Sequence, residues 1–483
     1  MRKIKYINAP DLTNARKRTA EIETVRYLYE PSEELVSSLK DKNFYIKTHG
    51  CQANLRDEET ISGLLYSLGL KKTDILDNAD VIIINTCSVR ENANDKVYAE
   101  LGNIKHLKNK KKDLILMVAG CMIETEDTLN KVINVYPHVD IIFGTHEINS
   151  LIELLDIYYK EQGKTRIINV SSKEGEIVED LPSKRTNKYS AFVNISFGCD
   201  NFCTYCIVPY TRGKERSRDL NDILTECKLL KKEGYQEVVL LGQNVDSYGK
   251  DLKDKNITFA NVLEEVAKLG IPRVRFLTSY PSEFSDSVID VMLKYPNIMK
   301  YIHLPVQSGS DSILKRMARR YTSKEYLDLV DRIRTKIPNI ALSTDLIVGF
   351  PNESDEEANE TVEFVKKVKY TSAFTFIYSP REGTPAAKIE DKVSYKTKVI
   401  RFKALTEALE SSIEEIANEM VGKIYPVLVT SVSKKDSRNL SGQAENNKTI
   451  NFKGDQSLIG KIVNVKVTES KVYSLNGELV END

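Results

Sequence analysis

The sequence predicts an α/β protein in three parts: a doubly wound N-terminal α/β domain, a central partial (β/α) barrel and a small C-terminal all-β barrel. Three observations support this prediction. Apolar runs alternate with amphipathic stretches up to about residue 160, and six further units of the same kind follow. The last 60 or so residues instead carry short strands separated by Gly and Asn turns. Strands that alternate with helices indicate parallel sheets covered on both faces.

Composition agrees with a folded protein of this size. The chain has 483 residues, of which 41% are hydrophobic and 29% charged, so a disordered chain is excluded. At roughly 150 residues per domain, the length fits about three domains. No apolar run approaches the ~20 residues of a membrane helix, and no apolar stretch follows the charged first five residues. We therefore expect a cytoplasmic monomer with no membrane partner.

The net charge is less informative. The 70 Lys and Arg residues balance 70 Asp and Glu residues, so the formal net charge is zero. Neutrality argues against a nucleic-acid partner, because phosphate binders usually carry excess positive charge. A local basic cluster can override this average, so the question stays open at this point.

The first domain is expected at residues 44–162. Residues 1–43 have no sustained period and carry the basic cluster Arg16–Arg18, so we read them as a loosely helical extension. Buried strands are then predicted, with helices between them, at 44–48, 81–84, 114–118 and 139–143. Residues 163–190 are polar, with Gly163 and Pro182, and are predicted to be a linker.

The central domain is expected at residues 191–420 and the last at 421–483. Strands of the partial barrel are predicted near 192–196, 237–241, 274–277, 301–304, 340–346 and 374–377. Residues 392–420 read as one long helix. Short strands at 427–432, 448–452 and 462–468 make the C-terminal all-β module.

The sharpest local pattern is a CxxxCxxC loop directly after the first strand of the barrel. Its thiols are Cys199, Cys203 and Cys206. Three thiolates can hold three irons of a 4Fe-4S cube and leave the fourth iron open. A structural zinc site would need a fourth Cys or His, and no His lies near this loop. The alternative is a zinc knuckle completed by a distant ligand.

Three other cysteines form no sequence motif but have equivalent positions, each just after a predicted strand. Cys51, Cys87 and Cys121 each follow a predicted strand of the first domain. Ligands bind at that edge of open α/β sheets, so these thiols are predicted to converge on a second open-iron cluster. Each could instead be a small buried hydrophobe. Cys227 lies among leucines in a predicted helix and is expected in the core, whereas His303 is expected to be structural or pocket-lining.

The CxxxCxxC loop after a first strand resembles the radical S-adenosylmethionine superfamily. The resemblance implies that Cys199, Cys203 and Cys206 are catalytic, because they hold the cluster that cleaves S-adenosylmethionine. It also implies further contacts to this cofactor, from Tyr205, Gly242, Gln243, Asn244, Gln307, Ile347 and Gly349. The loops at 242–244 and 347–351 could also be plain strand–helix turns.

Longer motifs narrow the resemblance to the methylthiotransferases that act on N(6)-dimethylallyladenosine in tRNA. The similar segments are 203–218, LLGQNVDSYG at 240–249, HLPVQSGS at 303–310 and YSPREGTPAA at 378–387. Residues 444–452 resemble the TRAM domain, an RNA-binding β-barrel. The fold implied is thus a radical-SAM barrel between an N-terminal methylthiotransferase domain and a TRAM-like module.

The resemblance implies a reaction that uses two 4Fe-4S clusters. S-adenosylmethionine serves both as methyl donor and as radical source, and sulfur is delivered through the auxiliary cluster at Cys51, Cys87 and Cys121. The methylthio group is placed on carbon 2 of N(6)-dimethylallyladenosine beside the anticodon. The partners implied are the tRNA anticodon loop, an electron donor such as flavodoxin or ferredoxin, and an iron–sulfur or sulfur carrier protein.

One basic run adjoins the proposed radical site and is predicted to bind RNA. Its members are Arg212, Lys214, Arg216 and Arg218. The run at 105–112 is expected to be a solvated helix face. Two rival functions remain: the same chemistry on threonylcarbamoyl-adenosine or on a ribosomal-protein aspartate, and a zinc-containing RNA-binding protein without catalysis.

Overall fold

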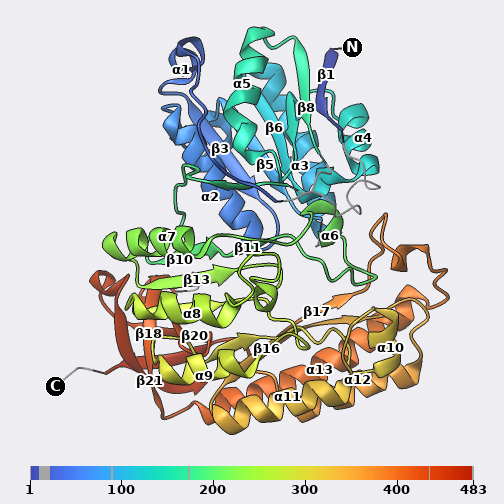
Figure 1. Ribbon diagram of the computed structural model, residues 1–483, viewed down its shortest axis with the longest axis vertical. Coiled ribbons are helices and arrows are strands. Elements are labelled where there is room, and N and C mark those ends of the chain that lie inside the picture. The colour runs from blue at the N-terminus through green and yellow to red at the C-terminus, as the bar shows by residue number, and fades with distance from the viewer. Residues whose placement is uncertain (1, 10–21, 89–90, 172–174, 435, 481–483) are drawn as a thin grey trace.

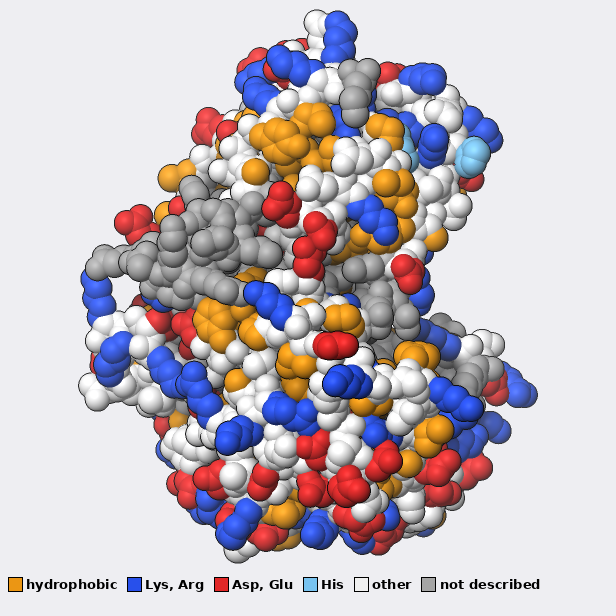
Figure 2. All heavy atoms as spheres, turned by 90° about the vertical axis from the view of Figure 1, so that its right-hand side faces the viewer, with side chains coloured by type: hydrophobic (Ala, Val, Ile, Leu, Met, Phe, Trp, Pro, Cys, Tyr) orange, Lys and Arg blue, Asp and Glu red, His pale blue; other side chains and the backbone are white. Residues whose placement is uncertain are grey.

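The computed structural model describes residues 2–9, 22–88, 91–171, 175–434 and 436–480. Figure 1 shows the N-terminal domain above the barrel, with the C-terminal module (red) at the left-hand side of the barrel. Figure 2, turned by 90°, shows a waist between the upper and lower lobes. None of the described helices is long and apolar enough to cross a membrane.

The N-terminal domain is a seven-stranded sheet in which every neighbouring pair is parallel. In spatial order its strands are β1 (Lys3–Asn8), β8 (Thr165–Asn169), β7 (Ile141–Phe143), β6 (Ile115–Gly120), β5 (Val81–Thr86), β3 (Asn43–Thr48) and β4 (Lys71–Lys72). β5 and β6 are buried along their whole length. A strand covered on both faces needs such a continuous apolar run.

Helices cover both faces of this sheet. One face packs against α1 (Glu33–Leu39), α2 (Gln52–Ser67) and α5 (Leu151–Lys160), and the other against α3 (Glu91–Lys110) and α4 (Glu126–Val135). The chain runs from β3 to the edge strand β4 and then crosses back to β5 on the other side of β3. The carboxyl ends of β3 and β5 therefore flank a switch point, where doubly wound sheets bind ligands.

Two expectations about this domain are wrong. Residues 1–43 are not a loosely helical extension, because Lys3–Asn8 forms the edge strand β1 and pairs with β8. Residues 163–190 are not only a linker, because Thr165–Asn169 is a buried strand between β1 and β7. Both strands are short and flanked by polar residues, so neither is long enough for a strand pattern to be recognised from the sequence. The cluster Arg16–Arg18 lies outside the described residues.

The central part is the predicted partial barrel, and all six expected strands are present. They are β10 (Ser190–Asn194), β13 (Glu237–Leu241), β14 (Arg273–Phe276), β15 (Tyr301–His303), β16 (Ala341–Val348) and β17 (Ser372–Ile377). They form two parallel three-stranded sheets, linked by a bridge between Val274 and Ile298. The pairings among described residues do not join β10 to β17, so the barrel stays open between these strands.

Helices cover the outside of the barrel. They are α7 (Leu220–Lys232), α8 (Phe259–Lys268), α9 (Asp286–Lys294), α10 (Asp311–Arg316), α11 (Ser323–Lys336) and α12 (Asp355–Val368). The expected long helix is α13 (Tyr395–Glu419), which packs against α12 and β17. Cys227 is fully buried in the barrel core, as expected.

The C-terminal module is a closed five-stranded barrel. Its strands are β18 (Ile424–Val432), β19 (Asn439–Ala444), β20 (Thr449–Lys453), β22 (Leu475–Leu479) and β21 (Ile462–Ser470), in the order in which they pair. β19 and β22 were not predicted. The buried Arg273 of β14 holds the module against the larger barrel, donating hydrogen bonds of 2.7 Å to the carbonyl oxygens of Gln443 and Pro426.

Candidate functional site

The three N-terminal cysteines lie at the carboxyl ends of three neighbouring strands. Cys51 follows β3, Cys87 follows β5 and Cys121 follows β6. A hydrogen bond with Cys87 lowers the pKa of Cys51 to about 5, although burial opposes the shift and Arg212 supports it. The structure brings Cys51 and Cys87 into contact, and the convergence of all three thiols on one cluster stays a prediction.

Arg212 reaches this group from the barrel domain. It follows the short helix α6 (Val208–Thr211), and its Nε donates a hydrogen bond of 3.2 Å to the Cys121 sulfur. Its Nη2 donates a second hydrogen bond, of 2.6 Å, to Asp57 on α2. Burial raises the pKa of Cys121 to about 11, while the positive charge of Arg212 acts against that rise.

The CxxxCxxC loop follows β11 (Ser196–Phe197), a two-residue strand that pairs with β12 (Arg216–Ser217). Gly198 precedes the loop with φ +69°, and a Cβ there would lie 2.1 Å from the carbonyl oxygen of Lys214. Only glycine, which has no Cβ, allows the backbone to come this close to Lys214. The loop is closed by the backbone N–H of Cys206, which donates to the carbonyl oxygen of Cys203 at 2.9 Å.

The donor set of each group suits an iron–sulfur cluster. Both consist of thiols, which are the ligands that such clusters prefer. Burial raises the pKa of Cys206 to about 12, so this thiol would become a thiolate only next to a strong positive charge such as bound iron. Arg319 supplies one N–H at 3.4 Å from the Cys203 sulfur, and its guanidinium lies 4.2 Å from the Tyr280 ring centre.

Within the described ranges, no three His, Cys, Asp or Glu side chains form a group arranged to hold a metal ion. The assignment of the six thiols as cluster ligands therefore stays a prediction. It depends on their sequence pattern and on their position at strand ends.

Most residues predicted to bind S-adenosylmethionine lie at or after the carboxyl ends of the barrel strands β13, β15 and β16. Tyr205 and Ile347 pack against one apolar cluster, which also contains Phe350 and Tyr378. Gly242 and Gln243 line the cavity described below. A Cβ at Gly242 would lie 2.6 Å from the Ser196 hydroxyl oxygen.

Two residues that were predicted to contact S-adenosylmethionine, Asn244 and Gln307, make contacts within the protein. The side-chain amide of Asn244 donates a hydrogen bond of 2.6 Å to Glu283. Gln307 has φ +73° and forms an isolated bridge with Leu346 of β16. Both residues fix the loops that carry them, and their contact with a cofactor stays a prediction.

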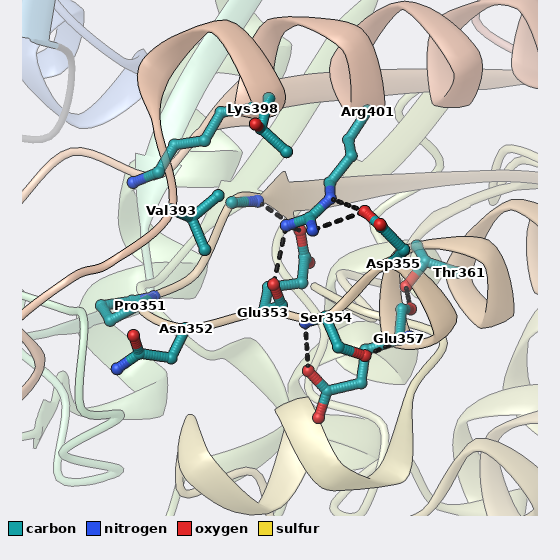
Figure 3. Close-up of polar contacts among 12 residues, drawn as sticks. Pro351, Asn352, Glu353, Ser354, Asp355, Glu357, Thr361, Val393, Lys398 and Arg401 are labelled. Atoms are coloured by element: carbon teal, nitrogen blue, oxygen red, sulfur yellow. Dashed lines mark hydrogen bonds and ion pairs between the residues drawn. The ribbon is translucent and has the colours of Figure 1, made fainter.

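The Gly349 loop is held from outside by an ion-pair cluster (Figure 3). The backbone N–H of Gly349, which has φ +68°, donates to the buried Glu353 carboxylate at 2.8 Å. Arg401 of α13 binds Glu353 and also pairs with Asp355 at 2.7 Å. The side chain of Lys398 packs against Gly349, where a Cβ would approach it to 2.6 Å. This cluster positions the strand end at which Ile347 lies.

A cavity of about 950 Å³ lies beside these groups, and of the six thiols only Cys51 is among its lining residues. Cys51 and Arg212 line it from the auxiliary side, and Gly242 and Gln243 from the barrel. It also reaches Asn447 of the C-terminal module. The other lining residues include several that the sequence analysis did not identify as site residues, namely Arg275, Asp345, Phe374 and Phe376. The alternation of aromatic residues along β17 was the only sequence signal for Phe374 and Phe376.

The predicted RNA-binding run lies mostly in the interior. Arg218 is buried and pairs with Glu179 at 2.6 Å and Glu226 at 2.7 Å, and Arg212 is bound as described above. Arg216 is 4% exposed and donates to the carbonyl oxygen of Lys214. These three side chains bind protein groups and also line the cavity, so RNA contact stays a prediction for all four residues of the run. On the face in Figure 2, Lys and Arg are interspersed with acidic side chains.

Family models match three segments of the chain. They are the Radical SAM superfamily over residues 193–365, the Uncharacterized protein family UPF0004 over 43–144 and the TRAM domain over 418–480. The radical SAM match covers five of the six strands of the partial barrel, and the TRAM match covers the closed barrel.

Solved structures of low sequence identity share the fold. The radical S-adenosylmethionine methyltransferase TsrM from Kitasatospora setae, with cobalamin and a [4Fe-4S] cluster bound, matches at TM-score 0.53 and 13% identity, over 72% of this chain and 77% of TsrM. The cobalamin-dependent radical enzyme OxsB, with aqua-cobalamin and S-adenosylmethionine bound, matches at TM-score 0.51 and 14% identity, over 84% and 61% of the two chains.

Two relatives match over nearly their full length. The tRNA-2-methylthio-N(6)-dimethylallyladenosine synthase of Staphylococcus haemolyticus (strain JCSC1435) is 47% identical over 472 residues, which are 98% of this chain and 91% of the relative. The enzyme of the same name from Bacillus subtilis (strain 168) is 47% identical over 480 residues, 99% and 94% of the two chains. The chain therefore belongs to the tRNA-2-methylthio-N(6)-dimethylallyladenosine synthases, a family of radical S-adenosylmethionine enzymes.

Proposed function

We propose that this chain adds a methylthio group to carbon 2 of N(6)-dimethylallyladenosine beside the anticodon of tRNA. The observation that carries the proposal is that a single cavity is lined both by Cys51 of the first cysteine group and by Gly198, which directly precedes the CxxxCxxC loop. Arg212 lines it beside Cys51, and Gly242 and Gln243 line it from the barrel. A volume of about 950 Å³ is enough for a nucleoside together with part of a cofactor.

The proposal assigns one 4Fe-4S cluster and S-adenosylmethionine to the barrel and a second 4Fe-4S cluster to the N-terminal domain. Cys199, Cys203 and Cys206 would hold the first cluster, and the three strand-end thiols would hold the second. When bound, these groups supply the radical and the sulfur that replacement of an aromatic C–H bond requires. The chain itself orients the substrate, excludes water from the cavity and fixes the thiols through Arg212 and Arg319.

The substrate base must leave its loop to reach this cavity. Single-stranded RNA loops can extrude a base at modest cost, because the base is already partly unstacked. The C-terminal barrel, which the TRAM model matches, would bind the anticodon arm. The proposal places the reaction in the cytoplasm. It also requires an electron donor of the flavodoxin or ferredoxin type and an iron–sulfur or sulfur carrier protein.

Nucleoside analysis of tRNA from cells lacking this gene tests the proposal. We expect N(6)-dimethylallyladenosine to accumulate without its methylthio group, and reintroduction of the gene to restore the group. A normal level of the methylthio nucleoside in the deletion strain would overturn the proposal. Loss of the methylthio group from threonylcarbamoyl-adenosine, or from a ribosomal-protein aspartate, would instead support the rival substrates.

An anaerobic iron and sulfide assay separates the enzyme from a zinc-containing RNA-binding protein. Two cubes ligated by cysteine correspond to about eight irons per chain. Stoichiometric zinc with almost no iron after anaerobic reconstitution would overturn the assignment of both clusters.

A further inference from the structure

Two phenylalanines of β17 lie unusually open for a strand that is part of a barrel. Phe374 and Phe376 are 49% and 40% exposed, and both line the cavity. They are two residues apart, so their side chains lie on the same face of the strand. Large apolar side chains that face a polar cavity, rather than a core, indicate a binding surface.

Polar groups lie directly beside this pair. Phe374 is in register with Asp345 of β16, and its ring makes an edge contact with His303 at 6.1 Å between centres. The Nε2 atom of His303 lies 3.5 Å from Asp345, and its Nδ1 atom lies 2.7 Å from the Ser343 hydroxyl oxygen. Acceptors and donors therefore adjoin the apolar surface formed by the two rings.

Deeper in the cavity there is a buried donor that lacks a partner. The side chain of Arg275 is 4% exposed and pairs with Glu237 at 3.1 Å. Its Nη1 atom has no hydrogen-bond partner among the described residues, and the guanidinium lines the same cavity. A buried donor left in this state is best explained by a ligand that accepts from it.

Phe374 and Phe376 lie near residues that are predicted to bind S-adenosylmethionine. Phe376 is in register with Ile347, one of the residues predicted to contact S-adenosylmethionine. The cavity continues from the two rings to Gly242, Gln243 and Cys51. A base stacked on this strand would therefore lie in the same cavity as Cys51 and as Gly198, which precedes the CxxxCxxC loop.

We propose that Phe374 and Phe376 form the seat for the dimethylallyl-substituted adenine, with the prenyl group against the rings. This inference rests on the proposed function. The dimethylallyl group is the apolar part of the substrate, and aromatic rings suit both it and the face of a purine. His303, Asp345 and Arg275 then face the polar edges of the base and its ribose. The pair would thus select prenylated over unmodified adenosine.

The test compares binding of two anticodon stem-loop RNAs to the full chain by fluorescence anisotropy. One RNA carries N(6)-dimethylallyladenosine and the other unmodified adenosine at the same position. We expect the wild type to prefer the prenylated RNA, and Phe374→Ala with Phe376→Ala to reduce this preference about 10- to 100-fold. Affinity for the unmodified RNA should fall much less, because it loses only the stacking of the purine on the rings.

Two further variants sharpen the comparison. Phe374→Leu with Phe376→Leu keeps an apolar surface and should restore most of the preference, which a misfolded protein could not do. Tyr395→Ala removes an exposed aromatic side chain of α13 outside the cavity lining and should behave as wild type.

Several outcomes would overturn the inference. One is a preference that survives in the double alanine variant, and another is a wild type without any preference. A third is a double variant whose loss lies in S-adenosylmethionine affinity, measured by equilibrium dialysis, because the rings would then belong to the cofactor site. Methylthio product formed from the prenylated RNA by the wild-type holoenzyme shows that the proposed function stands even where the inference fails.

Discussion

At the scale of single residues, Arg212 couples the two halves of the site. One guanidinium donates to the sulfur of Cys121 and to the carboxylate of Asp57, so it fixes a predicted cluster ligand from the opposite domain. Arginine can bind two acceptors in a fixed fork, whereas lysine is a flexible point charge. Hydrogen bonds to cluster sulfurs also tune the reduction potential of the cluster.

We expect Arg212→Lys to lower the reduction potential of the auxiliary cluster. The N–H···S bond stabilises the more negative reduced state, and its loss removes that stabilisation. Each tenfold change in a one-electron equilibrium corresponds to about 59 mV. Potentiometry followed by electron paramagnetic resonance measures the shift, with Lys214→Ala, a near neighbour in sequence, as the control. Equal potentials in Arg212→Lys and wild type would contradict this role.

Substitution of single cysteines should separate the two proposed clusters. We expect Cys203→Ala to abolish formation of deoxyadenosine, because the cluster that cleaves S-adenosylmethionine loses a ligand. Cys87→Ala should abolish methylthio transfer and keep part of the deoxyadenosine formation. Chromatography of both products from the reconstituted variants provides the measurement. Equal loss of deoxyadenosine in the two variants would refute this division of labour.

At the scale of elements, the C-terminal barrel is attached through backbone carbonyls. Arg273 is 2% exposed and donates to the carbonyl oxygens of Gln443 on β19 and Pro426 on β18. Burial lowers the pKa of Arg273 to about 10, so the side chain stays charged at neutral pH. Removing it leaves two part-buried carbonyl groups without this donor. A fully buried unpaired group costs about 1–3 kcal/mol, and a part-buried one costs less.

We therefore expect Arg273→Met to loosen the C-terminal barrel. Amide hydrogen exchange should become faster in β18 and β19, and affinity for the anticodon arm should fall. Arg332→Met is the control, because Arg332 forms an exposed pair with Asp286 at 3.5 Å. Unchanged exchange in β18 and β19 would show that other contacts hold the barrel.

The elements also show what the sequence could predict. Long apolar runs such as Val81–Thr86 were found because a strand covered on both faces needs an unbroken run. The strands Lys3–Asn8 and Asn439–Ala444 were missed, because an edge strand and a small barrel strand alternate over only a few residues. Lys3–Asn8 also pairs with β8, which is distant in sequence, and local periodicity cannot reveal such a partner.

The limit of local sequence patterns also explains which parts of the candidate site were predicted. The six cysteines were placed correctly relative to strand ends, because position after a parallel strand is a local property. The basic run was assigned to RNA because the sequence does not show that Arg218 lies between Glu179 and Glu226. The cavity role of Phe374 likewise depends on the opening between β10 and β17, which is a property of the whole barrel.

At the scale of the whole molecule, a charged cluster joins the N-terminal domain to the barrel. Glu226 of α7 binds Arg56 of α2, Arg185 of the connecting segment and Arg218 beside β12. These residues come from four separate segments, and Arg56, Arg185, Arg218 and Glu226 all line the cavity. The cluster therefore sets how the two domains lie around the proposed site.

The protonation state of Glu226 should control this junction. Burial alone would raise the pKa of Glu226, but Arg218, Arg56 and Arg185 together lower it to about 2. A folded-state pKa below the unfolded value stabilises the protein above pH ~4.3, and this contribution is lost as the pH falls towards 2. The shift corresponds to about 3 kcal/mol at neutral pH.

We accordingly expect Glu226→Gln to lower the melting temperature at pH 7, because three arginines then share the junction without their central carboxylate. The gap between variant and wild type should narrow as the pH falls from about 4 towards 2, because Glu226 then takes up a proton in the unfolded chain before it does so in the folded protein. Thermal unfolding at a series of pH values measures the gap. Glu363→Gln, which breaks an exposed pair with Lys366 on α12, is the matched control and should show no gap. A gap for Glu226→Gln that stays constant from pH 7 to pH 3 would mean that the side chain acts through packing and not through its charge.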